Sequence, residues 1–176
     1  ENYSLTEQKG KFRISASPYT LNDTKPVSAI LRRQTEHEFE ASTNFELNSS
    51  ADNEEAGMTL IQTNSHHYDF FIRKDKGQYI LQLRVKVGSL NYIAGEQKLK
   101  SNKIALKVVG TPLQYSFQYS DSGNSIYNEL GKLDTRYLST EVAGGFTGVM
   151  IGLYASSNGK PTKANAYFDL FDYQTK

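Results

Sequence analysis

Cysteine and tryptophan are both absent from this chain of 176 residues. Without cysteine the protein can form no disulfide, no thiolate metal site and no cysteine nucleophile. Without tryptophan it lacks the side chain that exposed sugar-stacking surfaces favour. No apolar run approaches the length of about 18 residues that a membrane span needs. A functional site must therefore be built from other aromatic, polar and charged side chains.

A strong net charge is also missing, because 20 basic side chains face 19 acidic ones and leave a formal charge of +1. Such a balance produces no field that would attract nucleic acid or anionic lipid. We therefore expect no nucleic-acid partner and no membrane partner.

The start and the length of the chain bear on its organisation. It begins at Glu1 with neither a methionine nor a signal peptide, which predicts a piece trimmed from a longer protein. The length fits one ordinary domain. Residues 1–10 are polar and are expected to be a residual linker, followed by a single domain over residues 11–176. The compartment stays open between cytoplasmic, periplasmic and secreted, because bacterial proteins of each kind can lack cysteine.

The abundant aromatic residues, 12 tyrosines and 9 phenylalanines, fall largely at alternating positions. Phe39–Leu47, Tyr79–Val87 and Tyr115–Tyr119 each alternate mostly apolar with mostly polar residues. This period of two buries one face and leaves the other in water, as in antiparallel strands. Further strands are expected at Lys11–Ala16, Ala29–Arg33, Met58–Ile61, His67–Lys74, Lys103–Val109, Gly148–Ala155 and Ala166–Tyr173.

Turn signals separate these strands. Asp75–Gly77 reads as a hairpin connection, Asp121–Asn124 as a second turn and Ser49–Glu55 as a polar loop. Helix signals are weak: Ile126–Leu133 mixes the two periods, and one helical turn is expected near Tyr137–Glu141. The pattern predicts an all-β fold, a sandwich of two antiparallel sheets.

Motifs for hydrolytic serine or nucleotide chemistry are missing, since neither Gly-x-Ser-x-Gly nor a phosphate-binding glycine loop occurs. Adjacent residues of a strand project to opposite faces, so His66 and His67 cannot share one metal ion without a bulge. We expect these imidazoles to be solvated or hydrogen-bonded.

The acidic residues were weighed as metal ligands and as catalytic groups. Asp52–Gly57 lacks the EF-hand spacing and is expected to be a solvated turn. A structural calcium ion held by backbone carbonyls and Asp169 stays possible, although no cofactor is required. Asp169 and Asp172 are expected on opposite faces of their strand, so they do not form the facing pair that glycoside hydrolysis needs. The sequence therefore predicts no catalytic residue in this chain.

Four segments resemble one family in the right order. They are Leu31–Gln34, Glu55–Met58, Leu138–Gly148 running into Val149–Ala155, and the closing Ala166–Tyr173. Together they resemble the C-terminal concanavalin-like β-sandwich domain of family 43 glycoside hydrolases, the β-xylosidases and their α-L-arabinofuranosidase relatives. The resemblance extends from about Lys11 to Tyr173, and it implies a concanavalin-like jelly-roll sandwich.

The resemblance implies that the catalytic carboxylates lie on a β-propeller of the same parent chain, absent from these residues. The chain alone would then be inactive, and the parent would hydrolyse xylo- or arabino-oligosaccharides. One loop of the sandwich would reach the rim of the sugar pocket. In this sequence that loop holds Gly144, Gly145, Phe146 and Thr147, with the Phe146 ring as an apolar wall.

Other interpretations stay open beside this one. Phe146 could be a core aromatic at the start of a strand, because phenylalanine is mostly buried. Arg32 and Arg33 could serve the contact with the propeller or be ordinary exposed strand charges. The whole domain could instead be an independent carbohydrate-binding module or a purely structural domain. The choice between xylose and arabinose would lie in the propeller.

Overall fold

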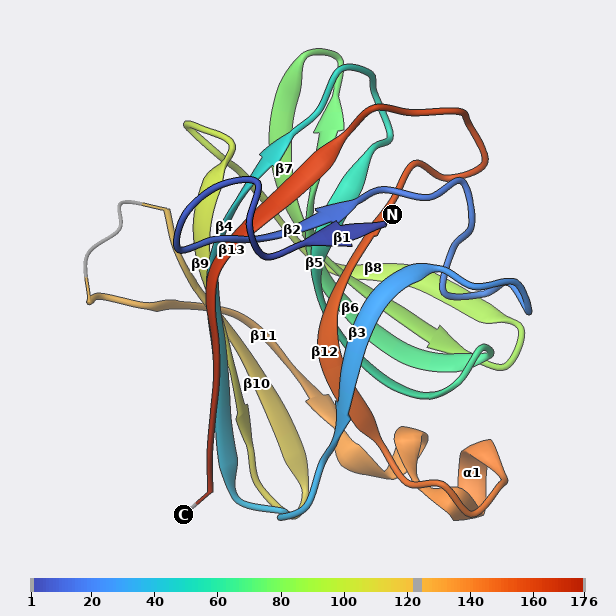
Figure 1. Ribbon diagram of the computed structural model, residues 1–176. Coiled ribbons are helices and arrows are strands. Elements are labelled where there is room, and N and C mark those ends of the chain that lie inside the picture. Colours follow the sequence, from blue (N-terminus) through green and yellow to red (C-terminus); the bar gives the residue numbers. More distant parts are fainter. Residues whose placement is uncertain (1, 122–124, 176) are drawn as a thin grey trace.

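Two antiparallel sheets face each other in the computed structural model, which describes residues 2–121 and 125–175 (Figure 1). The seven-stranded sheet runs, in spatial order, β1 (Tyr3–Ser4), β2 (Phe12–Ser15), β13 (Asn165–Thr175), β4 (Phe39–Asn48), β9 (Lys103–Gly110), β10 (Gln114–Ser120) and β11 (Asn128–Asp134). The six-stranded sheet runs β3 (Ser28–Arg33), β12 (Met150–Ser156), β5 (Glu55–Thr63), β6 (His66–Asp75), β7 (Gln78–Val87) and β8 (Leu90–Lys98). The predicted all-β, two-sheet concanavalin-like sandwich is confirmed.

The core lies between the two sheets and follows from the alternation in the sequence. The inward side chains of β4 are fully or almost fully buried, while the residues between them are more exposed. Across the layers, Phe70 of β6 meets Phe117 of β10 edge to face, with ring centroids 5.5 Å apart. Within the seven-stranded sheet, Phe45 stacks on Phe168 at 4.8 Å. Each such buried ring contributes about 1.5–3 kcal/mol relative to an exposed one.

Three strands were not expected from the sequence: β1, β8 and β11. β8 is an edge strand with mostly exposed side chains, so it carries no clear apolar alternation. β11 occupies most of the ambiguous stretch Ile126–Leu133, and its pairing with β10 shifts register between Phe117 and Gln118. Residues 122–124 of the turn predicted at Asp121–Asn124 lie outside the described residues.

The expected helical turn near Tyr137–Glu141 is present as two short pieces, the 3₁₀ turn η1 (Thr135–Leu138) and the helix α1 (Thr140–Ala143). They lie at one end of the sandwich, close to where β12 begins (Figure 1). No helix in the described part of the chain is long and apolar enough to cross a lipid bilayer.

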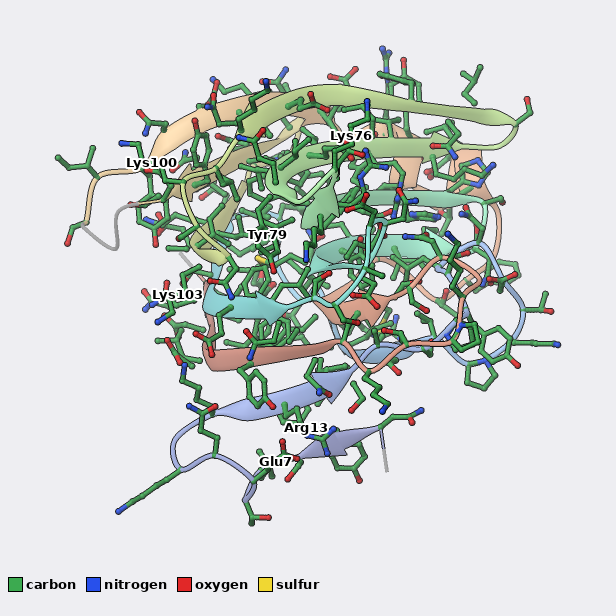
Figure 2. The ribbon with its side chains drawn as sticks, turned by 90° about the horizontal axis from the view of Figure 1, so that it is seen from above. Glu7, Arg13, Lys76, Tyr79, Lys100 and Lys103 are labelled. Atoms are coloured by element: carbon green, nitrogen blue, oxygen red, sulfur yellow. The ribbon has the colours of Figure 1, made fainter. Side chains whose placement is uncertain are left out.

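Part of the predicted linker lies on the edge of the seven-stranded sheet. Tyr3 and Ser4 pair with Ile14 and Arg13 of β2. The Arg13 side chain also forms an ion pair with Glu7 at 2.6 Å, at the edge seen in Figure 2. The division into a linker at 1–10 and a domain at 11–176 stays a prediction.

Candidate functional site

The loop that joins α1 to β12 projects from the end of the sandwich. Gly144, Gly145 and Gly148 have φ values of 75°, 81° and 71°, the left-handed region that side chains with a Cβ resist. Between Gly145 and Gly148, Phe146 is fully exposed to solvent. The interpretation of Phe146 as a core aromatic is therefore wrong. We call residues 144–148 the Phe146 loop.

Both ends of the Phe146 loop are held by hydrogen bonds. At its start, the Gly144 N–H donates to the carbonyl of Thr140 at 2.9 Å, and the Gln62 side-chain amide donates to the Gly144 carbonyl at 3.4 Å. Just after it, the carbonyl of Val149 accepts from the Gln34 N–H at 2.9 Å. The loop thus presents an apolar tip from anchored ends.

The two arginines with a predicted interdomain role lie at the end of β3. The Arg32 guanidinium stacks over the Tyr173 ring of its own domain, 3.8 Å from the centroid. Arg33 lies beside the Phe146 loop, where a Cβ added to Gly148 would lie 3.4 Å from its Nη1 atom. Both arginines are exposed. Their contact with another domain stays a prediction, and Arg33 is the one that lies beside the Phe146 loop.

A buried charged cluster lies on the outer face of the six-stranded sheet, and the sequence analysis did not find it. Its centre is Arg84 of β7, whose Nη2 donates to Glu55 Oε1 at 2.7 Å and whose Nε donates to Asp69 Oδ2 at 2.8 Å. The Tyr154 hydroxyl donates to Glu55 Oε1 at 2.9 Å. We call Glu55, Asp69, Arg84 and Tyr154, together with His67, the Arg84 cluster.

His67 joins the Arg84 cluster to the loop that covers it. Its Nδ1 lies 2.8 Å from Asp69 Oδ1, and its Nε2 lies 3.1 Å from Asn22 Oδ1. Beside Asn22, Leu21 packs against Phe71 and Tyr154 over the same face. The covering loop therefore keeps the Arg84 cluster away from solvent.

The environment of Asp69 decides what the Arg84 cluster can do chemically. Burial opposes ionisation of this carboxyl, but the charges of His67 and Arg84 and the hydrogen bonds from His67 and Thr59 outweigh it and lower the pKa of Asp69 to about 2. The acidic partners likewise raise the pKa of Arg84 against the effect of its burial. A covered carboxyl that is ionised at neutral pH cannot protonate a substrate there. The Arg84 cluster therefore has the character of a structural clamp.

The prediction of a solvated turn at Asp52–Gly57 is wrong for its two glutamates. Glu54 and Glu55 are 3% and 1% exposed. Hydrogen bonds to the Glu54 carboxylate, which outweigh its burial, lower its pKa. The donors are Ser49 Oγ at 2.7 Å, Ser50 N at 2.8 Å, Ala51 N at 3.0 Å and the Thr162 hydroxyl.

His67 is hydrogen-bonded to Asp69 and Asn22, as expected from the sequence.

The structure gives no support to a calcium site at Asp169. This carboxylate is half exposed and pairs with Lys11 Nζ at 3.3 Å. Among residues 2–121 and 125–175, no three His, Asp or Glu side chains gather in a way that could hold a metal ion. The expectation that Asp169 and Asp172 face opposite ways is wrong, because a β-bulge between Phe168 and Leu170 turns both outward.

The pKa values predict how stability depends on pH. Asp69 titrates near 3.8 when unfolded and near 2 when folded, so its stabilising contribution is complete above the unfolded value and is lost as pH falls toward 2. Denaturant titrations between about pH 5 and about pH 2 should show a loss of about 2 kcal/mol from this group. In Asp69→Asn the acid-induced loss should be shallower by that amount, and an identical pH profile in both proteins would contradict the assignment.

Comparisons with known proteins agree with the two-sheet fold of this chain. Residues 1–174 match the family of β-xylosidase C-terminal concanavalin A-like domains. The chain is 34% identical over 173 residues to the non-reducing end alpha-L-arabinofuranosidase BoGH43B of Bacteroides ovatus. The aligned region covers 98% of this chain and 32% of that protein. It is 31% identical over 165 residues to a xylosidase/arabinosidase of Butyrivibrio fibrisolvens, covering 90% of this chain and 30% of that protein.

A solved structure titled Bacteroides ovatus Xyloglucan PUL GH43B superposes with a TM-score of 0.93 at 31% identity. It covers 99% of this chain, and the chain covers 34% of that structure. The chain thus spans about a third of the length of the curated relatives and of this structure.

Proposed function

Since this chain belongs to the family of β-xylosidase C-terminal concanavalin A-like domains, we propose that its Phe146 loop completes the sugar pocket of a parent glycoside hydrolase. In this proposal the sandwich packs on a catalytic β-propeller of the same parent chain. The propeller holds the catalytic carboxylates, and this domain supplies one wall of the pocket without taking part in proton transfer.

The observation that carries the proposal is the full exposure of Phe146 on an anchored loop. A large apolar ring gains about 1.5–3 kcal/mol when it is taken out of water, so an exposed ring on a fixed support favours contact with a partner. A flat ring at the rim of a pocket can pack against a sugar and exclude water from the bond that is cleaved. Arg33 lies beside Gly148 at the end of the Phe146 loop and would share the contact with the propeller.

The names of the relatives support a substrate class for the parent. The two curated relatives are named as an arabinofuranosidase and as a xylosidase/arabinosidase. We therefore assign the parent a xylo- or arabino-oligosaccharide substrate, cleaved by an acid and a base that flank the glycosidic bond. Neither carboxylate of the Arg84 cluster fits those roles, because Arg84 pairs with both and the covering loop shields them.

Phe146→Ala in the parent enzyme is expected to raise KM about tenfold on nitrophenyl xyloside or arabinofuranoside. The reason is that the variant loses one aromatic contact with the sugar and no longer excludes water there. The melting temperature should not change, because the ring has no contacts within the domain to lose. Tyr92→Ala, another exposed aromatic on β8, is the matched control and should leave KM unchanged.

Two further measurements separate this proposal from its alternatives. The isolated chain should not hydrolyse either glycoside, and turnover by it would show that chemistry resides here. Calorimetry with xylo-oligosaccharides should show no binding to the isolated chain; millimolar or tighter binding would instead indicate an independent carbohydrate-binding module. Unchanged kinetics of Phe146→Ala would leave a purely structural domain.

A further inference from the structure

Gln62 lies at an irregular point of β5, directly beneath the Phe146 loop. The pairing of β5 with β6 shifts register between Ile61 and Thr63, so Gln62 is the extra residue of a β-bulge. A bulge leaves its extra residue unpaired in the strand ladder. The Gln62 side chain is 7% exposed, and its amide points at the start of the Phe146 loop.

The Gln62 amide is only half satisfied. Its Nε2 donates to the Gly144 carbonyl at 3.4 Å, while its Oε1 is buried without a hydrogen-bond partner among the described residues. A buried acceptor without a partner destabilises a fold. The amide is therefore poorly explained as a stabilising group of the sandwich.

Its contact with the loop gives a better explanation. Within the described part of the chain, Gln62 is the one side chain with a hydrogen bond to residues 144–147. It reaches Gly144, two residues before Phe146, where the positive φ turns the chain outward. The next anchor, from Gln34 to Val149, comes after the tip. Without Gln62, the chain from Gly144 to Gly148 would have no anchor on the sheet at its start.

We propose that Gln62 is a positioning residue that aims the Phe146 ring. The inference rests on the proposed function of the Phe146 loop for its catalytic consequence, but not for its effect on the loop itself. The proposal predicts that the mobility of the Phe146 loop and the stability of the sandwich respond separately. A structural residue would change both together. Loss of the amide should loosen the loop without lowering the stability of the sandwich.

The absence of tryptophan makes the loop directly observable. Phe146→Trp places the single indole of the chain at the exposed tip, where its time-resolved fluorescence anisotropy reports the motion of the loop. In this background, Gln62→Met keeps an unbranched side chain of similar length and removes both polar atoms. We expect a larger amplitude of fast motion and an unchanged or raised melting temperature. Gln97→Met, an exposed glutamine of β8, should change neither quantity.

A second variant isolates the donor. Gln62→Glu keeps the size and the acceptor of the side chain but replaces its N–H donor, so it should loosen the loop as Gln62→Met does. Unchanged anisotropy in both variants, or a lowered melting temperature with unchanged anisotropy, would overturn the proposal.

The parent enzyme connects the loop to catalysis. There Gln62→Met should raise KM about three- to tenfold with a small change in kcat, and it should add nothing in a Phe146→Ala background, since both changes act through one ring. If Phe146→Ala itself has no effect, the proposed function fails while the anisotropy result still tests Gln62. If Phe146→Ala raises KM and Gln62→Met does not, only the role of Gln62 is overturned.

Discussion

Arg84→Met is expected to lower the free energy of unfolding by about 3–5 kcal/mol, because it leaves buried carboxylates without their cation. Glu55 and Asp69 are almost completely shielded from water, and Arg84 bridges them at 2.7 and 2.8 Å. Methionine can fill much of the volume of the arginine stem but offers no donor to either acid. Urea unfolding followed by circular dichroism measures the loss.

The matched control for this prediction is Arg136→Met. Arg136 pairs with Asp134 at 3.0 Å at the protein surface, where water and salt screen the ion pair and its contribution to stability is small. Should Arg84→Met fail to fold, Glu55→Gln provides a milder test, since it removes one charge and leaves Arg84 paired with Asp69. A loss no larger than that of Arg136→Met in both variants would contradict the clamp role.

Gly152→Ala is expected to destabilise the domain by about 3 kcal/mol, through a clash of backbone atoms rather than through lost contacts. Gly152 lies in β12 between β3 and β5, opposite Leu31 and Thr59. A Cβ at this position would overlap the carbonyl oxygen of Ile30 and come within 2.8 Å of Leu31 Cα. Strand backbone cannot give way as a side chain does, so β3, the edge strand of this sheet, would have to move.

Gly131→Ala in β11 is the matched control for Gly152→Ala. There the new methyl group would lie 3.3 Å from Leu83 Cδ2, the far end of a flexible side chain, which can shift by the few tenths of an ångström required. Thermal unfolding should show a clearly smaller change in melting temperature than for Gly152→Ala. Equal losses in the two variants would show that the methyl group, and not the close approach of β12 to β3, is responsible.

The fold was largely predictable where a strand buries one face and leaves the other more exposed. Phe39–Leu47 alternates cleanly and became β4, which lies between β13 and β9. Prediction failed where a strand has no buried face or an irregular register. Edge strand β8 is mostly exposed, and the bulge that places both Asp169 and Asp172 outward leaves no mark in the spacing of the residues.

Some functional residues could be predicted from the sequence and others could not. The projecting position of Phe146 was expected only through the family resemblance, since base rates for phenylalanine favour burial. Glu55 was expected in a solvated turn, yet it is buried, and Asp69, which is also buried, carried no prediction. Their burial depends on Arg84 and on the loop that holds Leu21, and these partners come from remote parts of the sequence.

The positions of the last two strands have a consequence for synthesis on the ribosome. β12 lies between β3 and β5, and β13 lies between β2 and β4, so each late strand fills a gap in a sheet formed by earlier ones. Until both have emerged from the exit tunnel, the nascent chain exposes unpaired strand edges that can join those of a neighbouring polypeptide. Completion of each sheet therefore waits for these late strands, and a holding chaperone that shields those edges should increase the soluble yield.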